Sequence, residues 1–321
     1  MDITSTIGAG VAVKKKEIRA GRVKSSPWLR VCAFVKKKEK TIWGIVLVLP
    51  TLFLLWQFSY FPFLKTIFKS FHLTNIKGEI VAACGTDIYE NILKSTEFAN
   101  SLKVTFLFVL MTVFPSVTAA VLLAALCRKK LPGGKLMDIL FSMPVAVSST
   151  CVTMVFMSML DPSMGIINEI FHLNIKWYQE SAWALPSVAL VVNFSLIAMD
   201  FIFLNSAIRA IPASYYESVA LDGADGFKVF FHITLPSISP TIFFLLVINV
   251  LQAFQAFGPI NIMTKGGPAD ATNVLSYSIY KDAFYNYQFS FASAKSVLLF
   301  LLLLGVTLLQ MKMEKKRVFY Q

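Results

Sequence analysis

Charged side chains are scarce in this chain of 321 residues. Asp, Glu, Lys and Arg together make up 15% of it, against about 25% in an average soluble domain. Hydrophobic residues make up 56%, and Phe alone occurs 29 times. This composition excludes an ordinary soluble domain and indicates that a lipid bilayer surrounds most of the protein.

Cysteine and histidine are also scarce. The four cysteines are Cys32, Cys84, Cys127 and Cys151. They lack the spacing of a metal site, and of the four only Cys84 falls in an expected outer loop. The three histidines are scattered at His72, His172 and His232. We therefore expect no metal ion, no cofactor and no disulfide between outer loops.

A phosphate-binding loop is missing as well. Such a loop needs Gly-x-x-x-x-Gly-Lys-Ser/Thr, so that backbone amides can surround the phosphates. The nearest stretch, "LPGGKL", has Lys129 in place of the first glycine and Leu136 in place of the Ser or Thr. No nucleophile lies beside a candidate base either. We predict that the chain is not an enzyme and does not hydrolyse ATP itself.

Six long apolar runs are present, each with the roughly 20 residues that a membrane-spanning helix needs. They cover residues 41–62, 99–126, 136–160, 181–204, 238–263 and 292–311. Backbone polar groups must be paired inside lipid, so each run is expected to be a helix. Pro50, Pro115 and Pro144 fall inside the runs, and we expect each to kink its helix. The predicted fold class is an all-α integral membrane protein with six transmembrane helices.

The net charge of +12 follows the membrane topology. The charged residues lie between the apolar runs and at both ends of the chain rather than on one soluble face. This distribution argues against nucleic-acid binding. With the N-terminus inside, 21 of the 30 Lys and Arg residues fall on the cytoplasmic side. We predict cytoplasmic tails at 1–40 and 312–321 and a transmembrane domain at 41–311. The basic N-terminal tail lacks the features of a signal peptide and suits anionic lipid, with a specific partner site as the alternative.

The inner segment 205–237 is too long to be a simple connector, because 2–8 residues would join two helices. Ser214 and Glu217 have the spacing of a capping box, which predicts a short helix beginning at Tyr215. Gly223 suits the left-handed position that ends such a helix. The alternatives are that Glu217 only caps the helix and that Asp222-Gly223 is only a turn.

A second short helix is expected after Asp225, which is placed to cap it. Its Phe227, Phe230 and Phe231 are predicted to share one side, facing the membrane helices or the headgroups. Pro236 would close the segment. Pro240 suits the first turn of the next spanning helix.

The stretch "ESVALDGADGFKVFFHITLP" resembles the EAA loop of binding-protein-dependent ABC importer permeases. Ser218 and Val219 depart from that loop, which usually has alanines there. The matching residues are Glu217, Ala220, Asp222, Gly223, Ala224, Ile233, Leu235 and Pro236. Two other stretches, "TKGGPADAT" at 264–272 and "GIIN" at 165–168, are similar to segments of the sugar and glycerol-phosphate (maltose-type) branch. The resemblance covers about residues 41–311.

The resemblance implies a permease subunit in the inner membrane of a prokaryote. Its EAA helix would dock on a cytoplasmic ATPase through Glu217 and Gly223, with Ala220, Asp222 and Ala224 beside them. The implied partners are a second permease subunit, an ATP-binding-cassette ATPase dimer and an extracytoplasmic solute-binding protein. The implied cargo is a carbohydrate or a glycerol-phosphate-like solute.

Polar residues inside the spans are candidates for the solute path. Asn249, Gln252 and Gln255 are spaced to line one side of a helix, and Asn193 and Asp200 lie in the fourth span. Amides both donate and accept hydrogen bonds, as a polyhydroxylated solute requires. The structural alternatives are an ion pair between Asp200 and Arg209 and hydrogen bonds between helices.

Two other classes of function remain open at this point. An ion-coupled secondary transporter would need a coupling-ion site, for which Asp200 is the candidate, and often has an internal repeat, of which the sequence shows no clear sign. A membrane receptor or scaffold would move no solute.

Overall fold

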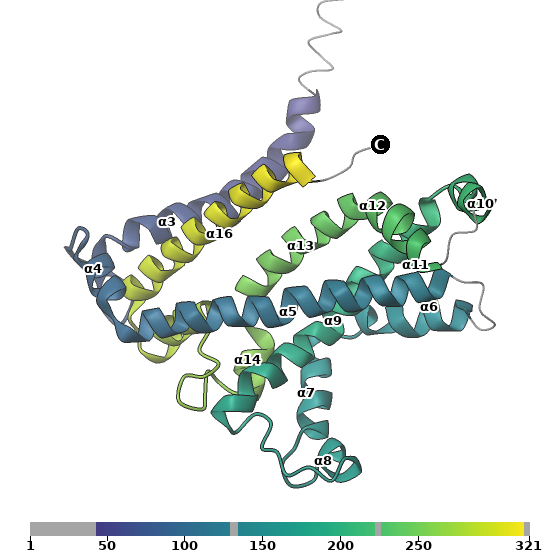
Figure 1. The fold of residues 1–321 in the computed structure, drawn as a ribbon. Helices are drawn as coiled ribbons and strands as arrows, with labels where there is room; N and C mark the ends of the chain where they lie inside the picture. The colour runs from purple at the N-terminus through teal and green to yellow at the C-terminus, as the bar shows by residue number, and fades with distance from the viewer. Residues whose placement is uncertain (1–42, 129–133, 222–225, 318–321) are drawn as a thin grey trace, which may run out of the picture. The chain divides into compact units, whose positions relative to one another are not determined.

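The computed structural model describes residues 43–128, 134–221 and 226–317. Helices dominate these ranges (Figure 1). The strands within them are β1 (His72–Thr74) and β2 (Ile80–Ala83), which pair antiparallel as a hairpin. The chain divides into two compact units, residues 1–65 and 66–321, and each is described by itself.

The described part of the first unit is one apolar helical run. Residues 43–55 are helical, a π-helical turn η1 follows at Trp56–Tyr60, and α3 (Phe61–Lys69) continues the run. The run Trp43–Lys69 has 27 residues, enough to span a bilayer. Every side chain from residue 43 to 65 is exposed in the isolated chain. Such an all-round apolar helix is stable only against lipid or another protein.

Four more helical runs of the second unit are long and apolar enough to cross a membrane. Two are the continuous helices α5 (Thr96–Arg128) and α9 (Ser181–Ala210). The third joins α13 (Ser239–Phe254) to α14 (Gly258–Met263), and the fourth is α16 (Phe289–Arg317). Helix α5 continues through Pro115 without ending. These helices confirm the predicted spans at 99–126, 181–204, 238–263 and 292–311.

The third predicted span is not one kinked helix but two helices with a sharp break. Helix α6 (Gly134–Ser142) leads into a 3-10 turn, η2 (Met143–Ala146), and α7 (Ser149–Met159) leaves at 103°. Pro144 has no N–H to continue the ladder, and Val147 is extended. Ser148 then starts α7 as its N-cap, accepting a hydrogen bond from the Cys151 amide at 3.3 Å. The expected kink at Pro144 is therefore a full break, and the spans number five, or six if the bent pair is one span.

The core lies where α5 and α9 run side by side (Figure 1). Ala120 and Ala124 of α5 are fully buried against Phe201 and Leu204 of α9. Small residues let two helix backbones approach closely, which is the main source of packing energy between helices in lipid. Helix α13 adds the buried Leu245 to the same cluster.

Short elements gather at the two ends of this bundle. We call the first the hairpin end, meaning residues 70–95, 161–180 and 255–288. Its elements are the β-hairpin, α4 (Asp87–Lys94), α8 (Ile166–Ile170), α14, α15 (Leu275–Tyr280) and η4 (Lys281–Tyr285). The second is the α10 end, meaning residues 134–146 and 205–240. Its short elements are α6, η2, α10 (Ala213–Leu221), α11 (Gly226–Val229), η3 (Phe230–Thr234) and α12 (Leu235–Ser237).

Candidate functional site

Helix α10 is the short helix that the sequence predicted after the fourth span. Helix α9 ends at Ala210 because Ile211, which precedes Pro212, is extended. Helix α10 then begins at Ala213, and the Tyr215 amide donates to the Pro212 carbonyl oxygen at 3.2 Å. The predicted start at Tyr215 is wrong by two residues. Ser214 lies inside the helix and is not its N-cap, so the predicted capping box is wrong as well.

Exposed side chains cover one side of α10. Glu217 and Ser218 are exposed, whereas Tyr216 and Val219 are half-buried. The backbone of Ala220 belongs to α10. Asp222, Gly223, Ala224 and Asp225 lie outside the described residues, and with them the predicted glycine stop and second cap. The described part of the loop therefore presents Glu217 on an open helical face.

The second half of the loop is helical for longer than predicted. Helix α11, the π-turn η3 and α12 follow one another from Gly226 to Ser237, so Pro236 lies inside the helical run rather than closing it. Pro240 occupies the first turn of α13, as expected. The hydroxyls of Tyr216 and Thr234 lie 3.3 Å apart and join α10 to this run.

The three phenylalanines of this run do not share a face. Phe230 packs against the buried cluster formed by α5 and α9. Phe227 is 81% exposed and Phe231 is 56% exposed. Positions 227 and 231 are four residues apart and so lie together on the outer side, while position 230 turns inward. The predicted single aromatic face is wrong for Phe230.

Arg209 does not pair with Asp200. Its guanidinium forms an ion pair with the Asp138 carboxylate of α6, and its Nε donates to the Asn205 side chain at 3.2 Å. Asn205 donates in turn to Asp138 Oδ1 at 3.1 Å. We call Asp138, Asn205 and Arg209 the α6–α9 triad. It links the broken third span to the end of α9, three residues before α10 begins.

Asp200 lies instead in a buried polar cluster at the centre of the bundle. Asn249 of α13 donates to Asp200 Oδ2 at 2.7 Å, and its side chain lies 3.2 Å from the Ser116 hydroxyl of α5. Asp200 and Ser116 are fully buried, and Asn249 is 2% exposed. Among the described residues, nothing bonds to Asp200 Oδ1. The cluster ties three spans together, which is the structural alternative considered for these side chains.

The other candidates for the solute path are divided between two environments. Asn193 is buried and donates to the Met111 carbonyl oxygen of α5 at 2.9 Å. Gln252 and Gln255 are exposed. Helix α13 ends at Phe254, so Gln255 is its C-cap, and neither glutamine is buried with Asn249. The structure therefore brings together Asp200 and Asn249 but not the glutamines.

The "TKGGPADAT" stretch forms a tight loop at the hairpin end. The buried Thr272 hydroxyl lies 2.7 Å from the Gly267 carbonyl oxygen and 2.7 Å from the Thr264 hydroxyl. Gly266 has φ of +80°, and a Cβ there would lie 2.7 Å from the Tyr277 ring. Only glycine combines this backbone conformation with so close an aromatic ring. The motif encodes the shape of this loop.

The segment around "GIIN" is a second tight turn at the same end. Asp161 Oδ1 accepts hydrogen bonds from the Ser163 hydroxyl at 2.7 Å and from the Ser163 and Met164 amides at 2.9 and 3.0 Å. These bonds, the Ser163 hydroxyl first, lower the pKa of Asp161 to about 2. A Cβ on Gly165 would lie 2.3 Å from the Asp161 carbonyl oxygen.

Asn168 completes that turn. Its side-chain oxygen accepts from the Trp177 indole N–H at 2.7 Å, and its amide nitrogen donates to the Ile175 carbonyl at 2.9 Å. Asn168 is 8% exposed. The sequence pointed to this residue through the family resemblance, and the structure shows that it joins α8 to the segment that leads into α9.

A bundle of long apolar helices with a two-helix loop at one end is an integral membrane domain. The comparisons with known proteins make the class specific. The family model described as "Binding-protein-dependent transport system inner membrane component" matches residues 42–317, and the chain belongs to that family. The resemblance stated from the EAA loop is confirmed.

The chain has curated relatives of similar length. It is 32% identical over 279 residues, covering 86% of this chain and 95% of the relative, to the sn-glycerol-3-phosphate transport system permease protein UgpA of Agrobacterium fabrum. The UgpA proteins of Rhizobium meliloti and Yersinia pestis are 32% and 31% identical with the same coverage.

Solved structures share the fold. A bacterial ABC transporter involved in the import of the acidic polysaccharide alginate matches with a TM-score of 0.78 at 22% identity, over 88% of this chain and 99% of that one. The same kind of transporter in complex with an alginate pentasaccharide-bound periplasmic protein matches with a TM-score of 0.77. The chain is thus a permease subunit of an ABC importer in the inner membrane, and it works with a solute-binding protein. ATP hydrolysis belongs to another subunit, and the ion-coupled alternative is not favoured.

Proposed function

We propose that this permease imports a carbohydrate or glycerol-phosphate-like solute. The observation that carries the proposal is the similarity, over 86% of the chain, to permeases named for sn-glycerol-3-phosphate transport. The shared fold of the alginate importer is in keeping with a solute of this class. The two tight turns at the hairpin end, at 161–168 and 264–272, are also typical of this branch.

The proposed coupling site is α10 with the residues that follow it. Glu217 and Ala220 lie on α10, and Asp222, Gly223 and Ala224 complete the motif. An exposed helix tied back to the bundle can transmit a rigid-body movement, which a loose loop cannot. Here the Tyr216–Thr234 contact ties α10 to the helical run of α11, η3 and α12. We propose that this helix docks on an ATP-binding-cassette ATPase dimer.

The proposed assembly adds a second permease subunit beside this one and an extracytoplasmic solute-binding protein at the hairpin end. The α10 end would face the cytoplasm, with the tails 1–40 and 312–321 on the same side and the domain 41–311 in the membrane. The positive charges between the spans support this orientation. The exposed first span, Trp43–Lys69, supports contact with lipid or with the second subunit.

The proposed solute path runs along polar residues of α9 and α13. Gln252 and Gln255 are exposed and carry free amide groups that suit sugar hydroxyls. Asn193, Asp200 and Asn249 lie deeper and hold α5, α9 and α13 together. In the proposed alternating-access cycle, ATP closes the ATPase dimer, α10 moves, and the path opens outward to receive solute from the binding protein.

Replacing Glu217 by Lys tests the coupling site. We expect copurified ATPase and solute uptake to fall at least about tenfold, because truncating an interface hot spot costs ~2 kcal/mol or more. The matched control is Glu169→Lys, which reverses an exposed charge on α8 at the other end. If the Glu217 variant keeps both its ATPase and its uptake, α10 is not the docking helix.

A further inference from the structure

A cavity at the hairpin end of the α5–α9 pair belongs to none of the features described so far. It has a volume of about 230 Å³ and is lined by residues of α5, α9 and the 264–272 loop. Its polar lining comes from Asn100 and Lys103 of α5 and Ser181 of α9. Leu107, Met111 and Leu185 form apolar walls. The lining therefore combines a cation and hydrogen-bonding groups with apolar side chains.

Lys103 is the unusual member of this lining. It lies within the span Thr96–Cys127, where a cation is costly and marks function by default. Its side chain is exposed, and no described carboxylate lies within 4.0 Å of its ammonium nitrogen. Lys295, inside the span Phe289–Glu314, is instead paired with Asp282 at 2.7 Å. Lys103 thus offers an unneutralised positive charge at the cavity.

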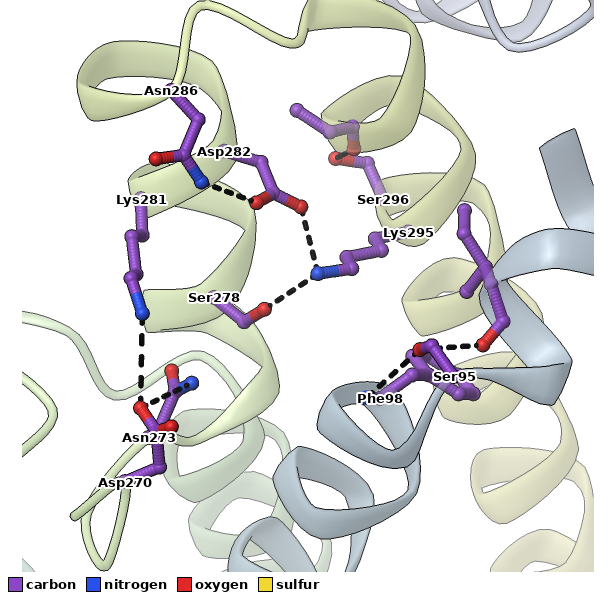
Figure 2. A network of polar contacts seen from close by, with 12 residues as sticks. Ser95, Phe98, Asp270, Asn273, Ser278, Lys281, Asp282, Asn286, Lys295 and Ser296 are labelled. Carbon is purple, nitrogen blue, oxygen red and sulfur yellow. Dashed lines mark hydrogen bonds and ion pairs between the residues drawn. The ribbon is translucent and has the colours of Figure 1, made fainter.

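The acidic residue of the 264–272 loop, Asp270, already has partners for its carboxylate. Asp270 precedes Ala271, which lines the cavity, but its carboxylate faces Lys281 at 3.7 Å and Asn273 at 3.2 Å (Figure 2). Its backbone carbonyl accepts from Asn100 at 3.2 Å, which fixes the loop against α5. Glu180 and Glu97 flank the cavity in sequence and do not line it. The lining therefore carries a net positive charge.

We propose that Lys103, with Asn100 and Ser181, binds the phosphate or carboxylate of an acidic solute on its way into the permease. The inference rests on the proposed import function and narrows its solute class to anionic carbohydrates and polyol phosphates. The cavity volume of about 230 Å³ is below the ~300–1,000 Å³ of drug-sized sites. The cavity therefore suits one acidic group and a few neighbouring carbons. The flexible ammonium is a point charge that suits such an anion.

The direct test is protection of Lys103 from acylation in the assembled transporter in nanodiscs, read by mass spectrometry. We expect sn-glycerol 3-phosphate to slow acylation of Lys103 severalfold and neutral glycerol to leave it unchanged. Lys94, an exposed residue on α4 paired with Glu90, is the internal control. Equal acylation with and without sn-glycerol 3-phosphate overturns the proposal.

A second arm separates a solute anion from a lipid headgroup. The same labelling is repeated in nanodiscs of phosphatidylcholine alone and with phosphatidylglycerol added. Protection that follows the lipid composition and ignores the added solute assigns Lys103 to lipid headgroups and overturns the proposal. Protection by the solute in both lipids supports it.

Uptake kinetics add a functional readout. Lys103→Gln should raise the KM for sn-glycerol 3-phosphate about tenfold, and Lys103→Arg, which keeps the charge, should change it far less. Lys94→Gln is the matched control. If the wild-type importer takes up no carbohydrate or polyol phosphate, the proposed function is wrong. If the importer is active and Lys103→Gln leaves its uptake kinetics unchanged, only the proposed anion subsite is wrong.

Discussion

At the hairpin end, a buried ion pair is satisfied within the chain. Lys295 of α16 and Asp282 of η4 form an ion pair at 2.7 Å with only 5% and 6% of their side chains exposed (Figure 2). Ser278 lies 2.8 Å from the same ammonium, and Asn286 donates to Asp282 at 3.1 Å. The turns at 161–168 and 264–272 are likewise closed by internal hydrogen bonds.

At the α10 end, a charged residue and two aromatic rings of one loop are exposed. Glu217 is exposed, and Phe227 and Phe231 present large apolar rings outward. The hydrogen bond between Tyr216 and Thr234 holds α10 from within, whereas its outer face is exposed among the described residues. Exposed aromatic rings and an exposed charge within one loop are typical of an interface.

The two ends differ in whether their charged side chains are paired within the chain or exposed. A buried ion pair joins η4 to α16 at the hairpin end, whereas the exposed loop at the α10 end is the part that we propose a second protein covers. Three further predictions test this contrast, from the largest expected effect to the smallest.

Breaking the buried pair should have the largest effect. Lys295→Ala leaves Asp282 as an uncompensated buried charge, which costs about 3–5 kcal/mol of stability. Lys281→Ala, which removes a more exposed pair at 3.7 Å, should cost about 0–1 kcal/mol. Thermal unfolding in detergent measures both.

The double change Lys295→Met with Asp282→Leu separates charge from packing. It should be more stable than Lys295→Ala because no unpaired charge remains. Equal losses for Lys295→Ala and Lys281→Ala would show that the hairpin end does not depend on its buried pair.

Asp161 should make the hairpin end sensitive to acid. Its pKa is lowered from 3.8 to about 2 by the Ser163 hydroxyl and the neighbouring amides, so the folded state favours the carboxylate. The stabilisation is present above pH 3.8 and is lost as the pH falls through about 2. Asp161→Asn should therefore lower the melting temperature at pH 7 and lose that difference in strong acid. A difference that is constant with pH would contradict this.

The α6–α9 triad should give the smallest change in stability. The pair between Arg209 and Asp138 is partly exposed, so Arg209→Gln is expected to cost about 0–1 kcal/mol. Because Arg209, the last residue of the triad, lies four residues before α10 begins at Ala213, we expect a weaker stimulation of ATPase activity by loaded binding protein, with ATPase copurification intact. Arg209→Lys should behave like Arg209→Gln if the link to Asn205 matters. Full stimulation in Arg209→Gln would show that the triad only joins helices.

The spans were predictable because a bilayer demands about 20 apolar residues for each crossing. The short helix that contains Glu217 was also predicted, from the spacing of Ser214 and Glu217, although that pair does not form its cap. Its exact start was not, because Pro212 and the extended Ile211 decided it rather than the Ser214 and Glu217 pattern. The break at Pro144 was underestimated, since a proline in a sequence does not reveal the angle at which two helix halves pack.

The candidate site was predictable only in part. Residues in one motif, such as Glu217 and Ala220, are neighbours in sequence and can be recognised there. The partners of Asp200 and Arg209 are 49 and 71 positions away, and local spacing carries no information about them. Lys103 and Lys295 were missed because a lysine near the end of an apolar run looks like an ordinary membrane boundary.

The sequence by itself determined that this protein lives in a membrane, has about six crossings and carries a loop that resembles the EAA loop, because hydrophobicity and motif spacing are local properties. The tertiary structure decided which polar groups are paired, which lysine is neutralised and which is left at a cavity, and where the third span breaks. Those outcomes depend on side chains that are far apart in the chain and meet only when the helices pack.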